Sequence, residues 1–229
     1  MSKIAIQLTN ISKQYTIHHE KPTLMEKFVK SAKLEKEEKY WALKNINIKI
    51  NKGESVGLFG PNGSGKTTLL KIISGITTPT SGEIKTKGKV ISLIDLEAGF
   101  HLDLSGIQNI YLNGMLLGMR KKEIDERLQK ITKFADINHF IDAPLFTYSK
   151  GMMLRLGFSI AIFSNPEILI LDESMGIGDD DFRTKSLAAI KSLYKRGITV
   201  LMAMHFIEYL KKYTNRVLFI DKGRIRKKS

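Results

Sequence analysis

The sequence feature that most constrains the fold is a glycine-rich stretch, GPNGSGKTT, at residues 60–68. The apolar run ESVGLFG that leads into it is typical of a short buried strand. The stretch KTTLLKIISG that follows has the pattern of a helix ended by Gly75. The glycine-rich stretch satisfies the pattern G-x-x-x-x-G-K-[ST], which holds phosphates when it lies between a strand and a helix. The chain is therefore predicted to be an α/β protein that binds a nucleotide.

The residue types of this loop suit the holding of phosphates. Glycine lets backbone N–H groups turn inward toward phosphate oxygens. Lys66 is expected to reach the β- and γ-phosphates, and Thr67 is expected to ligate Mg²⁺. The predicted nucleotide-binding residues of the loop are Gly60, Pro61, Asn62, Gly63, Ser64, Gly65, Lys66, Thr67 and Thr68.

Apolar runs alternate with helical patterns through the rest of the chain. GKVISLI, EILILDE and ITVLMAM read as strands, and residues 105–135 and 181–195 have mostly helical patterns. Such alternation predicts an α/β fold with a largely parallel sheet. Residues 95–165 are mostly helical in pattern and are interpreted as a subdomain inserted between two core strands.

Two strand-like segments precede the glycine-rich loop. IAIQLTNISKQYTI and ALKNINIKI both alternate apolar and polar residues, which predicts a smaller antiparallel sheet beside the parallel one. The first segment is expected to form an edge strand or two. Residues 16–40 are interpreted as an insertion, in which the four-residue spacing of Leu24, Phe28 and Ala32 favours a short amphipathic helix opening near Pro22.

Acidic and histidine side chains follow two of the predicted strands. Asp172 ends the buried strand ILIL, at the strand end where open α/β sheets bind ligands, and it suits coordination of Mg²⁺. Glu173 could polarise a water as a general base for attack on the γ-phosphate. His205 follows TVLMAM and could contact the γ-phosphate and hold that water. A lone histidine is more often structural, so a structural role for His205 stays open as the alternative.

Composition narrows the class of protein. The chain of 229 residues carries a net charge of +14, which favours anionic partners such as a nucleotide, a nucleic acid or an anionic membrane face. A codon bias that inflates lysine is an equally good explanation. The sequence has no cysteine, no apolar run long enough to cross a membrane, and no signal-peptide pattern at its start. These features predict a protein that stays in the cytoplasm.

The stretch YSKGM at residues 148–152 reads on its own as a helix start capped by Ser149. Together, however, the glycine-rich loop, YSKGM, ILILDE, GIGDDD and MAMH follow the order and spacing of an ATP-binding-cassette (ABC) ATPase, and the chain resembles that family from residue 3 to residue 228. The resemblance implies a single P-loop NTPase domain over residues 1–229, with a RecA-like parallel core, an N-terminal antiparallel β subdomain and a helical signature subdomain.

The resemblance also implies a head-to-tail homodimer in which the signature of one copy covers the ATP held by the other. Ser149 and Gly151 would then contact the γ-phosphate across the dimer, with Mg²⁺ as the second cofactor. Lys150 stands where the family usually has glycine, and Met152 where it usually has glutamine. Lys150 would either add charge beside the phosphate or point into solvent.

Three further site positions follow from the same resemblance. Asp179, in GIGDDD, resembles the D-loop aspartate and is assigned to nucleotide binding. Asp95 falls where most cassettes have the Q-loop glutamine, which implies a catalytic and metal-binding role for a shorter side chain. Tyr15 resembles the aromatic residue that stacks on adenine, and Trp41 is the competing candidate.

The segment LIDLEAGFHLDLSGIQNIYLNG, with TYSKGMMLRLGFSIA, is similar to cassettes that export O-antigen and teichoic acid. This resemblance implies an ATP-hydrolysing subunit that powers export of a lipid-linked polysaccharide. Its partner would be an integral membrane permease, and it would lie peripherally on the cytoplasmic face of the membrane. No C-terminal glycan-binding domain and no nucleic-acid partner are expected. The alternatives are a soluble cassette acting on nucleic acid, a small-solute importer subunit and a nucleotide sensor without catalysis.

Overall fold

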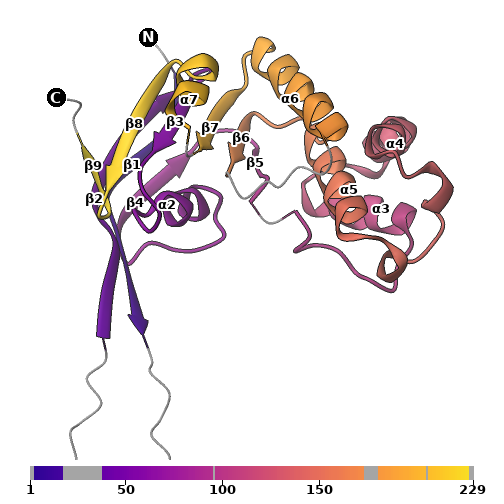
Figure 1. Ribbon diagram of the computed structural model, residues 1–229, viewed down its shortest axis with the longest axis horizontal. Helices are drawn as coiled ribbons and strands as arrows, with labels where there is room; N and C mark the ends of the chain where they lie inside the picture. Colours follow the sequence, from indigo (N-terminus) through magenta and orange to yellow (C-terminus); the bar gives the residue numbers. More distant parts are fainter. Residues whose placement is uncertain (1–2, 18–37, 95, 173–179, 205, 227–229) are drawn as a thin grey trace, which may run out of the picture.

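The computed structural model describes residues 3–17, 38–94, 96–172, 180–204 and 206–226. Two sheets stand beside each other and a group of helices lies on the far side of the larger sheet (Figure 1). In the part of the chain that the structure describes, no helix is long and apolar enough to cross a membrane.

The larger sheet has six strands in the order β5-β6-β7-β3-β8-β9. All neighbouring strands are parallel except β8 and β9, which form an antiparallel hairpin. The strands that read as buried runs, β6 and β7, have every residue buried, because helices or the second sheet cover both faces. The strands are β3 (Ser55–Phe59), β5 (Val90–Ser92), β6 (Ile168–Leu171), β7 (Thr199–Ala203), β8 (Arg216–Asp221) and β9 (Arg224–Arg226).

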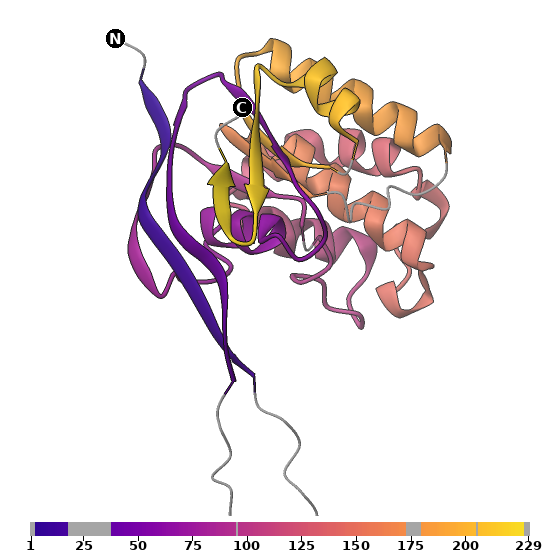
Figure 2. The same cartoon turned by 60° about the vertical axis from the view of Figure 1, so that its left-hand side comes forward.

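The smaller sheet is antiparallel and has the order β2-β1-β4. It consists of β1 (Ile4–Ile17), β2 (Glu38–Asn51) and β4 (Ser81–Thr86), and its two long strands run along one side of the molecule (Figure 2). The expectation of an edge strand at the N-terminus is wrong, because β1 is the central strand. Its apolar–polar alternation arises from one face covering the core and one face meeting solvent, which says nothing about position in the sheet.

The helices form around three apolar clusters. One cluster joins the two sheets and α2, a second packs α5, α6 and α7 on the larger sheet, and the third joins α3, α4 and α5. The helices are α2 (Lys66–Ile73), α3 (Gly106–Leu116), α4 (Lys121–Ala135), α5 (Lys150–Phe163), α6 (Asp180–Lys195) and α7 (Ile207–Tyr213), with short 3₁₀ turns η1 (Asn138–Phe140) and η2 (Leu145–Thr147).

The predicted fold class is confirmed: the chain is an α/β protein with a largely parallel sheet and a separate antiparallel sheet. Helices α3, α4 and α5 fall within residues 95–165, the segment that the sequence assigns to a helical subdomain. Both ends of segment 16–40, which the sequence assigns to an insertion, belong to the paired strands β1 and β2. The helix expected near Pro22 lies outside the described residues.

Candidate nucleotide site

The glycine-rich loop connects β3 to α2, as its sequence context predicts, and Lys66 is the first residue of the helix. Gly65 ends the loop in a left-handed conformation (φ +107°) that a residue with a side chain rarely adopts. A Cβ atom at Gly65 would lie 2.6 Å from the carbonyl oxygen of Ala42. The loop therefore approaches the neighbouring backbone as closely as only glycine permits.

Residues far away in the sequence hold the loop in place. The Gly223 N–H, in the turn between β8 and β9, donates a hydrogen bond to the Ser64 carbonyl oxygen over 2.9 Å. The Gly223 carbonyl oxygen accepts from the Lys44 N–H on β2 over 2.8 Å. At the start of the loop, a Cβ atom at Gly60 would lie 2.1 Å from the carbonyl oxygen of Ile220. The loop is thus packed against the last hairpin and tied through it to β2.

Two polar side chains in the loop suit the binding of phosphates. Lys66 is buried, and its ammonium group donates to the Gly60 carbonyl oxygen over 2.8 Å and to that of Pro61 over 3.1 Å. The Ser64 hydroxyl is buried and has no hydrogen-bond partner among the described protein atoms. Because buried polar atoms are normally satisfied, this hydroxyl fits a site that a polar ligand completes.

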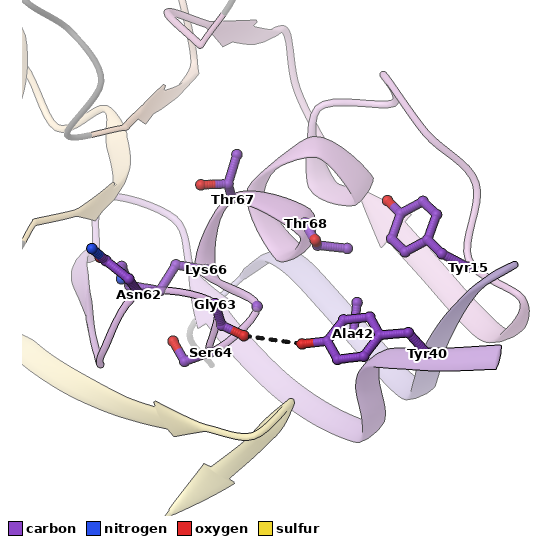
Figure 3. Close-up of a pocket in the computed structure, with 10 residues that line it drawn as sticks. Tyr15, Tyr40, Ala42, Asn62, Gly63, Ser64, Lys66, Thr67 and Thr68 are labelled. Carbon is purple, nitrogen blue, oxygen red and sulfur yellow. Dashed lines mark hydrogen bonds between the residues drawn. The ribbon is translucent and has the colours of Figure 1, made fainter. Parts of the chain in front are cut away.

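A cleft of about 270 Å³ opens beside the loop and contains two tyrosines (Figure 3). Tyr15 and Tyr40 are direct cross-strand partners on β1 and β2, so their side chains lie on the same face of the hairpin. The Tyr40 hydroxyl donates to the Gly63 carbonyl oxygen over 3.2 Å. The lining residues are Tyr15, Tyr40, Ala42, Asn62, Gly63, Ser64, Gly65, Lys66, Thr67 and Thr68.

Trp41, the alternative adenine-stacking residue, does not line this cleft. It pairs with Gln14, one residue along each strand from the two tyrosines, and successive residues of a strand point to opposite faces. The geometry favours Tyr15 as the stacking residue, and that role stays a prediction.

Replacing Tyr15 with alanine is expected to weaken ATP binding about tenfold, since stacking of a base on an aromatic ring contributes about 1–3 kcal/mol. Trp41→Ala is the matched control and should bind ATP within about twofold of the parent chain. Fluorescence titration with a labelled ATP analogue measures both affinities. A larger loss for Trp41→Ala than for Tyr15→Ala would contradict the assignment.

Asp172 directly follows β6 and is buried, with 2% of its surface exposed. Strand β6 and the loop-bearing strand β3 are parallel members of one sheet, so Asp172 and the loop lie at the same edge. Thr67 is exposed at the start of α2. A hydroxyl and a carboxylate at one sheet edge are oxygen ligands of the kind that Mg²⁺ uses together with water and phosphate oxygens.

Four predicted site residues lie outside the described residues: Asp95, Glu173, Asp179 and His205. Their assigned roles stay predictions from the sequence.

The YSKGM stretch begins helix α5, and Ser149 is its N-cap. The Ser149 hydroxyl oxygen accepts a hydrogen bond from the Met152 N–H over 3.2 Å, as the ordinary capping interpretation predicts. Ser149 and Lys150 are exposed. Outside the helix backbone itself, a Cβ atom at Gly151 would meet, of the described residues, only the Ser149 hydroxyl oxygen within 4 Å. None of these residues lines the cleft beside the glycine-rich loop of the same chain. An open helix N-terminus of this kind is free to meet a ligand presented by another molecule.

Comparison with known proteins agrees with this geometry. The family described as ABC transporter matches residues 43–176. The O-antigen export system ATP-binding protein RfbB of Klebsiella pneumoniae is 37% identical over 96% of this chain and 92% of its own length. The teichoic acids export ATP-binding protein TagH of Enterococcus faecalis is 41% identical over 82% of this chain and 42% of its own length.

The chain belongs to the ABC transporter family. The resemblance read from its motifs is confirmed, and with it the assignment of the chain as an ATPase of that family. A solved ATP-binding cassette, described as a dimer in a post-hydrolysis state bound to ADP and Pi, has the same fold. It superposes with a TM-score of 0.76 at 24% identity over 98% of this chain and 97% of that one.

Sequence reasoning missed two residues of this ABC ATPase site. Tyr40 falls in the segment that the sequence assigns to an insertion, and pairing of the two N-terminal strands is the signal that places an aromatic residue opposite Tyr15. Gly223 was not singled out. Its only local signal is a glycine in the turn DKGR between two strand-like segments.

Proposed function

We propose that this chain is the ATP-hydrolysing subunit of an exporter of lipid-linked polysaccharide. It would act as a head-to-tail homodimer beneath an integral membrane permease, at the cytoplasmic face of the membrane. The observation that carries this proposal is the similarity over nearly the whole chain to a protein named for O-antigen export, supported by the similarity to a teichoic acid export protein.

Each residue of the proposed site would have its own role in ATP binding and hydrolysis. Lys66 would hold the β- and γ-phosphates, the loop N–H groups would surround their oxygens, and Tyr15 would stack on the base. Thr67 and Asp172, with Asp95, would hold Mg²⁺, which supplies charge neutralisation at the phosphates. Glu173 would take a proton from the attacking water, and His205 would orient that water.

The second copy would complete each site. Ser149, which is exposed, and Gly151 lie at the start of α5, and both are absent from the cleft of their own chain. In a head-to-tail pair, these two residues and Asp179 would reach the nucleotide held by the other copy. Closing and reopening of the pair would drive the permease.

Glu173→Gln is expected to accumulate an ATP-bound dimer, because ATP still closes the pair while the base that activates water is gone. Size-exclusion chromatography with light scattering, in ATP and in ADP, measures the dimer. The control is Glu167→Gln, the same change just before the other end of β6, where the carboxylate accepts from the Lys89 N–H. Hydrolysis by Glu173→Gln at the parent rate would remove Glu173 from this role.

The export assignment is tested by isolating the tagged chain from gently solubilised native membranes and identifying its partners by mass spectrometry. We expect a multi-span permease in equal amount, encoded beside glycan-synthesis enzymes. A small-solute permease with a substrate-binding protein would replace the exporter with an importer. Recovery of a soluble protein with nucleic acid alone would overturn membrane export and leave only the ATPase.

A further inference from the structure

A buried asparagine in the motif GFHLDLSGIQNIYLNG forms hydrogen bonds with the backbone carbonyl groups of the loop that precedes its helix. Asn109, on α3, is fully buried. Its amide nitrogen donates to the carbonyl oxygens of His101, Leu104 and Ser105 over 2.9–3.0 Å. Its amide oxygen accepts from the His101 N–H over 2.9 Å. One side chain thus fixes the backbone of residues 101–105.

A second asparagine, one turn further along α3, forms a hydrogen bond with the same loop. The Asn113 amide nitrogen donates to the Gly99 carbonyl oxygen over 3.0 Å. A Cβ atom at Gly99 would lie 2.1 Å from the Asn113 amide oxygen, so the contact requires glycine there. The two amides together attach residues 99–105 to α3.

The fixed loop in turn positions the segment that leads into α5. The Leu145 N–H donates to the Leu104 carbonyl oxygen and the Phe146 N–H to that of Leu102, each over 3.0 Å. Ser105 also forms an isolated bridge with Pro144. Residues 144–146 are therefore paired with the loop that Asn109 holds.

Ser149 follows this paired segment by three residues. Between them, the buried Tyr148 donates its hydroxyl to the Phe140 carbonyl oxygen over 2.6 Å and contacts the start of α3, where a Cβ atom at Gly106 would lie 2.4 Å from that hydroxyl. Burial, together with the nearby Asp142 carboxylate, raises the pKa of Tyr148 to about 12, so the hydroxyl stays a donor at neutral pH. Hydrogen bonds and close contacts therefore connect Asn109 to the residues that lead into Ser149.

We propose that Asn109 is a positioning residue for Ser149, and that it acts on the ATP bound by the other copy of the chain. This inference rests on the proposed head-to-tail homodimer. Asn109 does not line the cleft beside the glycine-rich loop, and α3, the helix that carries it, packs with α4 and α5 (Figure 1). Asn109 would therefore act on ATP through the start of α5, where Ser149 lies, and not through the glycine-rich loop of its own chain.

Asn109→Asp tests the proposal, because it keeps the shape of the side chain and replaces the donor facing three carbonyl oxygens with an acceptor. In a Glu173→Gln background, we expect the variant to bind ATP as a monomer within about twofold of the parent, and ATP-driven dimerisation to weaken at least about tenfold. Asn138→Asp adds the same charge at an exposed position, the first residue of η1, and should dimerise normally. Asn109→Ser, which introduces no charge, is the second variant and should show a smaller loss.

A mixed pair distinguishes action across the dimer from action within one chain. One chain carries Asn109→Asp, a differently tagged chain carries Lys66→Ala, and both also carry Glu173→Gln. In a head-to-tail pair of the two, one composite site is intact, because it combines the unchanged glycine-rich loop of the first chain with the unaltered start of α5 of the second. We expect ATP to bring them together as well as it joins a Lys66→Ala chain to a chain with Asn109 intact. This capture also shows that the Asn109→Asp chain is folded and binds ATP.

Three outcomes would overturn the inference. Normal dimerisation of both Asn109 variants, loss of ATP binding by the isolated variants, or failure of the mixed pair while its reference pair forms would each do so. If the Glu173→Gln chain itself stays monomeric in ATP, the proposed homodimer is what fails. Loss of dimerisation confined to the Asn109 variants leaves the homodimer standing.

Discussion

Gly60→Ala is expected to weaken ATP binding about 100-fold. The new methyl carbon would lie 2.1 Å from the Ile220 carbonyl oxygen and 2.9 Å from the Ser64 hydroxyl oxygen, and the backbone cannot absorb such an overlap without moving. Because β3 and β8 pair side by side at this point, the loop must shift away from the last strand. A shift of about 1 Å in a phosphate-holding group can cost about 100-fold, and overpacking costs about 1–3 kcal/mol in the free energy of unfolding.

Isothermal titration with ATP and thermal unfolding measure the two effects of Gly60→Ala separately. Gly75→Ala is the control, since Gly75 has a left-handed backbone (φ +76°) but, among the described residues other than its chain neighbours, no atom lies within 4 Å of the place its new methyl carbon would take. That variant should lose about 1 kcal/mol of stability through backbone strain and bind ATP normally. ATP binding by Gly60→Ala within about twofold of the parent would show that the overlap is relieved without moving the loop.

Lys66→Ala is expected to reduce ATP hydrolysis by about 10²- to 10³-fold, the loss typical of removing one preorganised group that stabilises developing charge. The buried ammonium already donates to two loop carbonyl oxygens, so its removal takes away both a charge for the phosphates and a support of the loop. Release of phosphate under saturating ATP measures the rate, and ATP titration measures the affinity. We expect both to fall.

Lys71→Ala is the matched control for this second prediction. Lys71 lies in the last turn of the same helix, α2, where a basic side chain interacts with the helix dipole and not with the loop. Its removal should lower stability by less than about 1 kcal/mol and leave hydrolysis within about twofold. Equal losses of hydrolysis for both variants would mean that Lys66 acts only through general charge or helix stability.

The loop and its flanking elements could be predicted because their signals are local. A run of apolar residues, a glycine-rich turn and a helical pattern succeed one another within about twenty residues, and each depends only on its neighbours in the sequence. For the same reason the buried strand before Asp172 was recognised from its sequence alone. Strands of a parallel sheet are covered on both faces, so they read as continuous apolar runs and can be recognised without knowledge of their neighbours.

The choice between aromatic residues at the cleft was decided by the register of one hairpin. Lys13 pairs with Leu43, but Gln14 pairs with Trp41, so β2 contains one extra residue at Ala42. Without that bulge, Trp41 would lie opposite Tyr15, because a slip of one residue moves every side chain to the other face. The bulge therefore places Tyr40, rather than Trp41, in the cleft beside Tyr15.

The phosphate loop, the buried strands and the family therefore follow from the sequence alone, because these depend on local pattern and spacing. Four features became apparent only in three dimensions: β1 is central, Tyr40 faces the loop, Gly223 ties the loop to β2, and residues 144–146 pair with residues 102–105. Each of these is a contact between segments distant in the chain. Such contacts depend on strand register and on close backbone approach, which short-range sequence patterns do not encode.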